Sequence, residues 1–263
     1  MQETLNLDQT QPLHKTSVMC RAVDNLELLL SQPDESVDLI YCDILYGTGR
    51  NFGDYQDLKP IRSEIEAHYL PRLKEMHRVL KDTGSIYFQM DTRINHWLRI
   101  LMDEVFGYDN FRNEIVWAYR WGSRHKNKWN SKHDVILFYS KSKEWTFNAD
   151  DVREEYSKNS IMTKDKKYNK SYNEKGALPR DIINMEIINS MSNEKCGYPT
   201  QKPKELIKRF ILASSNENDV VADYYLGSGT TAVVCKELNR NFIGCDINPK
   251  AIEITSYRLD AVS

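Results

Sequence analysis

The sequence predicts an α/β protein with a mostly parallel sheet and helices on both of its faces. Strand-like and helix-like stretches alternate through the first part of the chain, and this alternation returns after Pro203. Between these parts, strand-like runs follow one another closely, which is typical of antiparallel pairing. With 263 residues, of which 40% are hydrophobic, the chain is long enough to bury one sizeable core.

The first part of the chain predicts alternating elements up to Leu80. Residues 17–22 form a short strand, residues 24–30 a short helix, and Val37–Cys42 the strongest early strand. From Ile65 to Leu80, apolar residues recur at spacings of four, four, three and four, which places them on one face of an amphipathic helix. Pro71 lies inside this helix, and we expect a kink there.

A further strand and helix follow. Thr83-Gly84 is expected to end the long helix, and Ser85–Met90 to form the next strand. Asp91 or Thr92 is expected to cap a second amphipathic helix, because a short polar side chain there accepts a hydrogen bond from the first turn. The apolar stripe of that helix is Ile94, Leu98, Leu101 and Val105.

The middle of the chain predicts antiparallel strands and then a long excursion. Residues 113–119, 134–140 and 145–147 are strand-like and are separated by short polar segments. Residues 149–196 are polar and lack clear periodicity, and such a long stretch is usually a functional excursion or partly disordered.

The last part of the chain returns to the α/β pattern. The final helix is expected to begin through Asn248 as its cap and Pro249 as its first residue. The elements before it are a helix over 203–214, a strand over 219–224, a helix over 230–238 and a strand over 241–246.

Composition argues against several classes of protein. No run of about 18 apolar residues occurs, so we expect no membrane span. Residues 1–15 are polar and acidic and lack the apolar centre of a signal peptide. The five cysteines are widely spaced and form no Cys-x-x-Cys pair, so neither a zinc site nor a disulfide framework is indicated. A reducing, cytoplasmic compartment fits this composition best.

The net charge of −2 hides a strongly basic segment. Residues 120–143 hold seven Lys and Arg against one Asp, and Tyr119, Trp121, Trp129 and Tyr139 are interleaved with them. Basic and aromatic residues together suit a polyanion with stackable bases, although an ordinary solvated face explains the segment equally well by itself. The basic residues are Arg120, Arg124, Lys126, Lys128, Lys132, Lys141 and Lys143.

A first candidate site follows the strand Val37–Cys42. The strand ends at Asp43, and Tyr46 and a loop with three glycines come next. Proteins with parallel sheets bind ligands at the carboxyl ends of their strands, so an acid and an aromatic at this point are candidate reactive groups. Taken alone, the stretch fits a buried strand that ends in a solvated turn at least as well.

A second candidate site lies near the C-terminus, where residues 219–232 predict a strand, a glycine turn and a helix start. Gly227 and Gly229 let the backbone approach a ligand closely, and Asp246 ends the next strand, where a carboxylate accepts bonds from ribose hydroxyls. Residues 227–232 also match a dinucleotide fingerprint, so an NAD protein is an alternative. Too few strands follow the turn for a dinucleotide fold, which favours a cofactor with a single nucleoside.

In this order, the two sites resemble the motifs of the β-class amino-methyltransferases of DNA, which use S-adenosylmethionine. In that family an Asp-Pro-Pro-Tyr/Phe catalytic motif comes first and a Phe-x-Gly-x-Gly cofactor motif late, with target recognition between them. Here they fall on Asp43-Ile44-Leu45-Tyr46 and on Tyr225-Leu226-Gly227-Ser228-Gly229. The resemblance extends from about His14 to Leu259. The flanking segments that match are 47–50, 78–80, 113–117, 132–134 and 197–203.

The resemblance implies a methyltransferase domain with a seven-stranded type of sheet and a circularly permuted motif order. Residues 14–148 would be its catalytic part, 149–196 a target-recognition excursion and 197–263 its S-adenosylmethionine-binding part. Asp246 would bind the ribose and Asp24 the adenine end, although a helix N-cap explains Asp24 equally well. The implied cofactor residues are Asp24, Asp43, Thr200, Gln201, Lys202, Pro203, Asp223, Tyr225, Gly227, Ser228, Gly229, Thr230, Thr231 and Asp246.

The resemblance also implies the chemistry of the first site. An exocyclic amine is a poor nucleophile, because its lone pair is delocalised into the ring of the base. An ionised Asp43 and the carbonyl of Ile44 would accept its two N–H bonds and aim the lone pair at the methyl group. Tyr46 would stack on the extruded base, which is worth roughly 1–3 kcal/mol. Residues 47–57 would form a mobile loop beside it, and Asp at the head of the motif favours adenine N6.

Ile44 and Leu45 stand where the family has two prolines, and each loss removes about 0.4–1 kcal/mol of preorganisation. We expect the chemistry to persist. A catalytically weakened DNA- and cofactor-binding subunit, an N4-cytosine methyltransferase and an NAD-dependent oxidoreductase are the alternatives. The expected partners are double-stranded DNA, a cognate restriction endonuclease and a second copy of the chain. The expected DNA-contacting residues are Arg120, Arg124, Lys126, Lys128 and Lys132.

Overall fold

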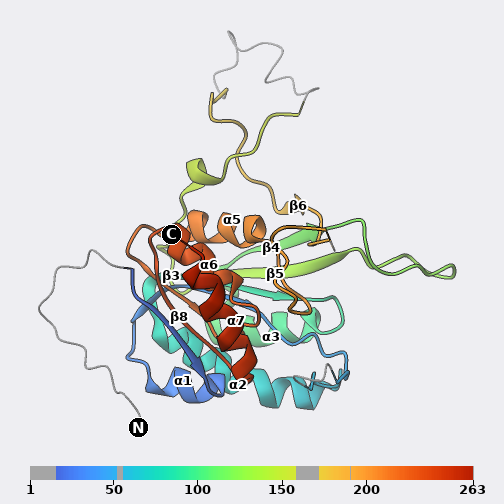
Figure 1. The fold of residues 1–263 in the computed structure, drawn as a ribbon, viewed down its shortest axis with the longest axis horizontal. Coiled ribbons are helices and arrows are strands. Elements are labelled where there is room, and N and C mark those ends of the chain that lie inside the picture. Colours follow the sequence, from blue (N-terminus) through green and yellow to red (C-terminus); the bar gives the residue numbers. More distant parts are fainter. Residues whose placement is uncertain (1–15, 52–55, 158–171, 190, 263) are drawn as a thin grey trace, which may run out of the picture.

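A computed structural model describes residues 16–51, 56–157, 172–189 and 191–262 (Figure 1). The polar N-terminal segment 1–15, part of the glycine loop at 52–55 and part of the excursion at 158–171 lie outside the described residues. Within the described part of the chain, no helix is long and apolar enough to cross a membrane.

The described residues form one sheet with the strand order β1-β8-β7-β2-β3-β5-β4-β6. The five strands from β1 to β3 in this order are parallel to one another. β5 is antiparallel to both β3 and β4, and β6 is parallel to β4. The predicted mostly parallel α/β sheet is therefore confirmed. Its strands are β1 (Val18–Ala22), β2 (Val37–Asp43), β3 (Leu80–Met90), β4 (Phe111–Ala118), β5 (His133–Ser140), β6 (Ile182–Asn184), β7 (Val220–Asp223) and β8 (Asn241–Asp246).

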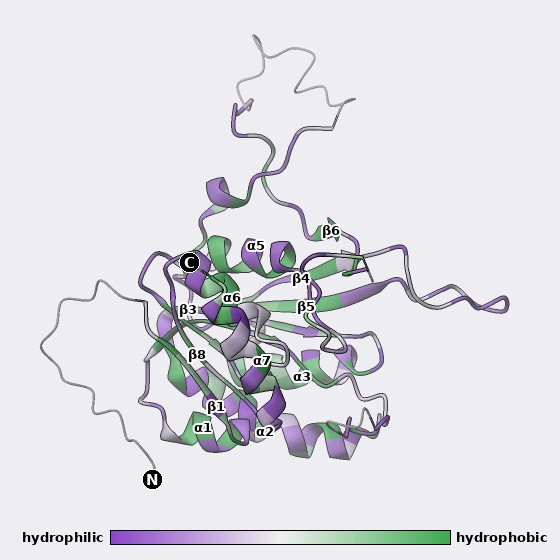
Figure 2. Cartoon of the chain, viewed as in Figure 1, coloured by the Kyte–Doolittle hydropathy of each residue, from purple (hydrophilic) through white to green (hydrophobic). Residues whose placement is uncertain are grey.

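Helices cover both faces of the sheet. The apolar faces of α1 (Asn25–Ser31), α2 (Arg62–Val79) and α3 (Asn95–Phe106) pack into one core, and those of α5 (Lys204–Ser214), α6 (Thr230–Glu237) and α7 (Pro249–Asp260) into a second. Figure 2 shows hydrophobic residues predominating in the central strands and alternating with hydrophilic residues along the helices. Two short 3-10 helices, Tyr108–Asn110 and Ala149–Val152, complete the described elements.

The central strand β2 shows how the sequence produces this arrangement. Ile40 and Cys42 point into the core beneath α1, α2 and α3, whereas Leu39 and Tyr41 point toward α5 and α6. Alternate side chains of a strand face opposite sides, and both sides are covered here, so the strand must be apolar almost throughout. This burial fixes β2 at the centre of the sheet and brings Asp43 to its carboxyl edge.

The structure contradicts the predicted end of the long helix and the predicted cap of the next one. β3 begins at Leu80, directly after α2, because Leu80 already pairs with Val37 of β2. α2 runs without interruption through Pro71. α3 begins after Ile94 without a side-chain cap, since the Asp91 carboxylate accepts instead from the backbone N–H of Arg93, at 2.7 Å.

The predicted strand over residues 145–147 is also wrong. Thr146 donates a backbone hydrogen bond to Thr83 at 3.2 Å, but no ladder forms. The Arg112 guanidinium lies 3.6 Å from the centre of the Trp145 ring, and Phe147 stacks on Phe138. The aromatic residues therefore cover the core without joining the sheet. At the C-terminal end, the predicted Asn248 cap and the Pro249 helix start are confirmed.

Candidate functional site

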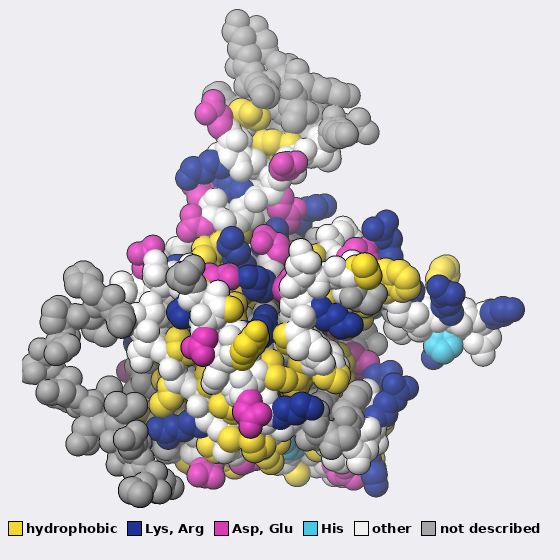
Figure 3. All heavy atoms as spheres, viewed as in Figure 1, with side chains coloured by type: hydrophobic (Ala, Val, Ile, Leu, Met, Phe, Trp, Pro, Cys, Tyr) yellow, Lys and Arg dark blue, Asp and Glu magenta, His cyan; other side chains and the backbone are white. Residues whose placement is uncertain are grey.

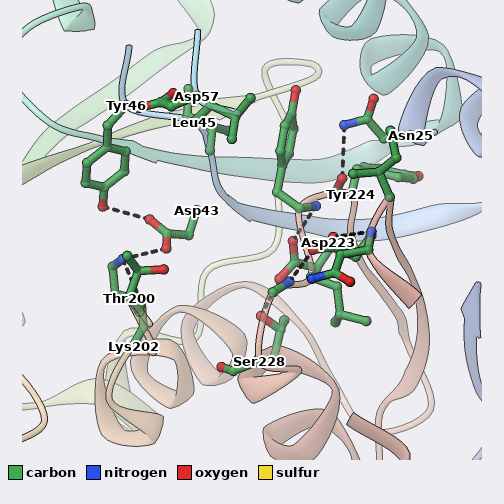
Figure 4. A pocket seen from close by; sticks show the side chains of 18 of the residues that line it. Asn25, Asp43, Leu45, Tyr46, Asp57, Thr200, Lys202, Asp223, Tyr224 and Ser228 are labelled. Atoms are coloured by element: carbon green, nitrogen blue, oxygen red, sulfur yellow. Dashed lines mark hydrogen bonds and ion pairs between the residues drawn. The ribbon is translucent and has the colours of Figure 1, made fainter. Parts of the chain in front are cut away.

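A cavity of about 640 Å³ opens at the carboxyl edge of the sheet. Asp43 at the end of β2, Asp223 at the end of β7 and Asp246 at the end of β8 all line it. Tyr46 and Lys202 stand at the Asp43 side of this cavity, and the glycine turn after β7 lies across from them (Figure 4). The two sites predicted separately from the sequence are therefore two walls of one cavity.

The glycine turn holds its shape through left-handed backbone at Gly227 (φ +52°) and Gly229 (φ +73°). Gly227 donates its N–H to Asp246 Oδ2 at 2.9 Å. A Cβ at Gly229 would lie between 2.2 and 2.7 Å from side-chain atoms of Thr255 in α7. Gly229 is thus required for close packing of α7 on the turn, and it does not line the cavity.

Asp223 is a buried acid at the base of the cavity. Its carboxylate accepts hydrogen bonds from Tyr225 N at 3.0 Å and from Thr231 Oγ1 at 2.6 Å. Burial raises the pKa of Asp223 to about 7, although these two hydrogen bonds act in the opposite direction. Thr231 therefore orients an acid beneath the glycine turn, and the Thr231 hydroxyl itself is buried.

Asp246 and Asn248 shape the neighbouring wall of the cavity. Asp246 Oδ1 accepts from Asn248 N at 2.9 Å, and Asn248 Oδ1 accepts from Lys250 N at 3.0 Å, which caps α7. Asn248 Nδ2 is buried beside the cavity and has no hydrogen-bond acceptor among the described residues. An orphaned donor beside carboxylates fits a nucleoside, whose hydroxyls and ring nitrogens supply acceptors. The sequence identified Asn248 only as a cap.

Asp24 is placed for both of the roles considered for it, the N-cap of α1 and contact with the cofactor. It caps α1 by accepting from Leu26 N at 2.8 Å, and it forms an ion pair with Arg72 Nη2 at 2.9 Å. It also lines the cavity, so contact with the cofactor remains a prediction. Arg72 donates to the neighbouring Asn25, whose side chain in turn donates to Tyr224 O at 3.1 Å, and these contacts tie this wall to the residue that follows β7.

Asp43 is held between a cation and a hydroxyl. Lys202 Nζ lies 2.5 Å from Asp43 Oδ2, and Tyr46 donates its hydroxyl to Asp43 Oδ1 at 2.8 Å (Figure 4). Burial raises the pKa of Asp43 above its usual range, and the Lys202 ammonium lowers that pKa in part because it stabilises the carboxylate. Lys202 also lies 5.2 Å from the centre of the Tyr46 ring.

The segment 200–203 contributes only in part. Thr200, in left-handed backbone at φ +65°, and Lys202 line the cavity. Gln201 turns away, because its amide donates to Glu194 O at 2.7 Å and accepts from Cys196 N at 2.9 Å. Pro203 precedes α5 and does not line the cavity. Of the other implied cofactor residues, Tyr225, Gly227, Ser228, Thr230 and Thr231 line the cavity.

Two acids that the sequence analysis did not single out complete the site. Asp134 on β5 lies 2.8 Å from Tyr46 OH and is the alternative acceptor for the hydroxyl proton that Tyr46 donates to Asp43. The segment 132–134 had matched the family without revealing this contact. Asp57 accepts from Gly47 N at 3.1 Å and from Thr48 N at 2.7 Å, so it anchors the described start of the glycine loop. Neither contact has a local sequence signal, since 88 and about ten positions separate the partners.

Residues 119–132, which include the first part of the basic segment, connect β4 and β5 as a hairpin loop that projects from the body of the protein (Figure 1). Figure 3 shows Lys and Arg side chains gathered along it, with hydrophobic groups among them. Trp129 is 97% exposed and Trp121 is 61% exposed. Arg120 forms an ion pair with Glu186 at 2.5 Å. Arg124, Lys126 and Lys128 are exposed, whereas Lys132, directly before β5, is half-buried.

Comparisons with known proteins agree with this geometry. The family model described as DNA methylase matches residues 37–256. The Type II methyltransferase M.HpaI of Haemophilus parainfluenzae is 36% identical over 243 residues, covering 92% of this chain and 72% of that protein. The DNA adenine methyltransferase YhdJ of Escherichia coli strain K12 is 33% identical over 246 residues, covering 91% of this chain and 82% of its own.

Solved structures share the fold. The PvuII DNA methyltransferase (cytosine-N4-specific) superposes with a TM-score of 0.69 at 19% identity, covering 93% of this chain and 86% of its own. The complex of M1.HpyAVI with SAM gives 0.61 at 22% identity, covering 92% and 100%. With a family model across most of its length, this chain belongs to the N6/N4 DNA methylase family, and it is a DNA methyltransferase that uses S-adenosylmethionine.

Proposed function

We propose that this chain methylates N6 of adenine in double-stranded DNA, with the base extruded into the cavity beside Asp43. The observation that carries the proposal is the shared cavity, in which the Asp43 and Tyr46 wall faces the glycine turn and its acids. The similarity to a relative named as a DNA adenine methyltransferase supports adenine as the target. N4 of cytosine is the alternative, because the family model includes both chemistries.

The residues divide into a cofactor end and a base end. S-Adenosylmethionine, when bound, supplies a methyl group carried on a positive sulfonium. Asp246 and Asn248 would hold its ribose, while Asp223 and the turn at Gly227 would shape the methionine side. The carboxylates suit this cofactor because they offset its positive charge and accept its hydroxyl and amino protons.

At the base end, Asp43 and the carbonyl of Ile44 would accept the two N–H bonds of the amine. This pairing favours the pyramidal nitrogen that attacks the methyl group and aims its lone pair at that group. The nitrogen would gain a bond to the methyl carbon as the sulfur–methyl bond breaks and leaves a neutral thioether, and the nitrogen would then lose one proton. Asp43, which is paired with the Lys202 ammonium at 2.5 Å, would be the nearest acceptor for that proton.

The hairpin between β4 and β5 would contact the DNA. Arg124, Lys126 and Lys128 would neutralise phosphates, and the exposed Trp129 would offer a stacking surface. The excursion over 149–196 would contribute to target recognition. We expect the affinity for duplex DNA to fall steeply as salt rises, and a fluorescence anisotropy titration at several salt concentrations measures this slope. An affinity that stays constant with salt would refute the electrostatic role.

The adenine assignment is tested by incubating the protein with unmethylated genomic DNA and S-adenosylmethionine, followed by mass spectrometry of the released nucleosides. We expect N6-methyladenine from the wild type and from Asp82→Ala, an exposed carboxylate away from the cavity, and almost none from Asp43→Ala. If the product is N4-methylcytosine, the target base is cytosine and the adenine assignment is refuted. Cofactor binding without any methylated nucleoside would support a catalytically weakened subunit.

The cofactor end is tested with Asn248→Ser. Serine keeps the cap of α7 but removes the orphaned Nδ2 donor. Loss of one hydrogen bond of about 1 kcal/mol should raise the Kd for S-adenosylmethionine about fivefold, measured by calorimetry, with little change in melting temperature. An unchanged Kd would remove Asn248 from the site.

The Type II names of several relatives also motivate a partner endonuclease with the same recognition sequence, and we propose a cytoplasmic location for the pair. A second copy of the chain is the other proposed partner. Protection of methylated DNA from a candidate endonuclease encoded nearby tests the first, and sedimentation analysis tests the second.

A further inference from the structure

We propose that Tyr69 and Asp134 are positioning residues that hold the turn Asp43–Tyr46 in its reactive geometry, in place of the stiffness that proline gives such a turn. The inference rests on the proposed function of this turn. Ile44 and Leu45 leave φ free at two successive residues, so the geometry must be imposed from outside the turn. Three neighbouring elements, α2, β3 and β5, make the contacts that impose it.

The first contact fixes the start of the turn. Ile44 is 4% exposed and packs into the core, and its N–H donates to the Gln89 carbonyl of β3 at 3.1 Å. A proline at position 44 has no N–H and would lose this hydrogen bond. The isoleucine is therefore suited to its place in the sheet, where its backbone extends the pairing between β2 and β3.

The second contact fixes the end of the turn. Tyr69 is fully buried on α2, and its hydroxyl donates to the Leu45 carbonyl at 3.0 Å. The Tyr69 ring is itself held edge-on against Phe88 of β3. A buried phenol in a fixed rotamer gives the Leu45 carbonyl a single direction.

These two contacts bracket the one peptide unit that the chemistry needs. Within the described residues, the carbonyl of Ile44 accepts no hydrogen bond and the N–H of Leu45 has no acceptor. The backbone groups on either side of this unit, the Ile44 N–H and the Leu45 carbonyl, are both hydrogen-bonded. The Ile44 carbonyl is thus held in place and left unpaired, as an acceptor for the amine of the base requires.

The third contact sets the Tyr46 ring. Tyr46 OH lies 2.8 Å from both Asp43 Oδ1 and Asp134 Oδ2, so the hydroxyl is held between two acids and donates its single proton to one of them at a time. Asp134 is buried and is held in turn by Gln89 Nε2 at 3.1 Å and Tyr119 OH at 3.0 Å. A carboxylate fixed by two other donors presents one oxygen to Tyr46, and this fixes the plane on which a base would stack.

The test compares single-turnover rates of methyl transfer in four variants. Tyr69→Phe and Tyr46→Phe each remove one hydroxyl, Asp134→Asn removes one charge, and all three keep the shape of the side chain. Tyr87→Phe is the matched control, because Tyr87 is an equally buried tyrosine whose hydroxyl pairs with Ser214 Oγ at 2.8 Å, away from the turn. We expect rates about three- to tenfold lower in the first three variants, with an unchanged Kd for S-adenosylmethionine and an unchanged rate in the control.

Proline provides the decisive arm of the test. Leu45→Pro removes no hydrogen bond of the described residues, so in the Tyr69→Phe background it should restore most of the lost rate. Ile44→Pro should fail to restore it, because it breaks the bond to Gln89. A merely structural role for Tyr69 would lower the melting temperature without this selective rescue.

The outcomes separate this inference from the proposed function. An inactive wild type would refute the proposed function. An active wild type with Tyr69→Phe and Asp134→Asn as fast as Tyr87→Phe would overturn the positioning roles alone. A slow Tyr69→Phe variant that Leu45→Pro leaves equally slow would also overturn them, because the loss would then not arise from freedom of the turn.

Discussion

The ion pair between Lys202 and Asp43 gives the sharpest prediction about this site. In Lys202→Met the carboxylate keeps its burial and loses its cation. The Lys202 and Asp43 side chains are only 10% and 20% exposed, so solvent screens the pair little. Removing one partner of such a pair typically costs about 3–5 kcal/mol. We expect a loss of about 3 kcal/mol in the free energy of unfolding at pH 8.

The sign of the pH dependence follows from the pKa of Asp43. Burial raises this pKa in the folded protein and Lys202 lowers it, so the substitution raises it further. A carboxyl group whose pKa is raised on folding stabilises the protein at low pH, and this stability is lost as pH rises through the folded pKa. The deficit of Lys202→Met should therefore shrink toward pH 5. The acidic limb of its methylation rate should move to higher pH, since a protonated Asp43 accepts poorly.

Urea unfolding at pH 5 and pH 8 measures this effect. Lys204→Met is the matched control, because the Lys204–Glu237 pair is 37% and 34% exposed and should be worth no more than about 1 kcal/mol. Adding Asp43→Asn to Lys202→Met should recover part of the stability, because no buried charge is then left unpaired. If Lys202→Met cost no more than the control at pH 8, or if the double variant lost the sum of both singles, the reasoning would be refuted.

Three further predictions concern other parts of the molecule. The rise of the Asp223 pKa from 3.8 to about 7 corresponds to about 4 kcal/mol, so Asp223→Asn should reduce the loss of stability between pH 4 and pH 8 in urea titrations. Gly229→Ala should destabilise by several kcal/mol, on the order of an overpacked core, because its Cβ meets Thr255. Gly227→Ala has the same left-handed strain with its nearest contact at 3.5 Å, and thermal melts should show a smaller loss. Trp129→Ala should weaken duplex DNA binding about fivefold or more without changing the melting temperature, as anisotropy would show.

The sequence determined most of the fold because the decisive signals are local. The buried run of β2 and the stripe of α2 each arise from the periodicity of neighbouring residues, and the cap at Asn248 needs only the residue that follows it. Where a long-range contact competes with a local signal, prediction failed. Leu80 pairs with Val37 and so starts β3 before the expected Thr-Gly stop.

In the candidate site, too, residues with a local sequence signal could be predicted and residues brought in by long-range contacts could not. Asp43, Tyr46, Gly227 and Asp246 could be named from the sequence, because each stands at a strand end or in a glycine turn. The sequence also predicted that one group of residues would bind base and the other cofactor. What holds these residues in their geometry could not be predicted, since Asp134 meets Tyr46 across 88 positions.

The sequence alone therefore predicted which side chains would perform the chemistry, and the tertiary structure decided how these side chains are held. The absence of proline at positions 44 and 45 weakens the local preorganisation of the turn, and this can be read directly from the sequence. The Gln89 carbonyl and the Tyr69 hydroxyl that fix the turn belong to β3 and α2, and only packing of these elements against β2 brings them within hydrogen-bond distance. Hydrogen bonds act over about 3 Å in space and independently of separation along the chain, so their partners become visible only in the fold.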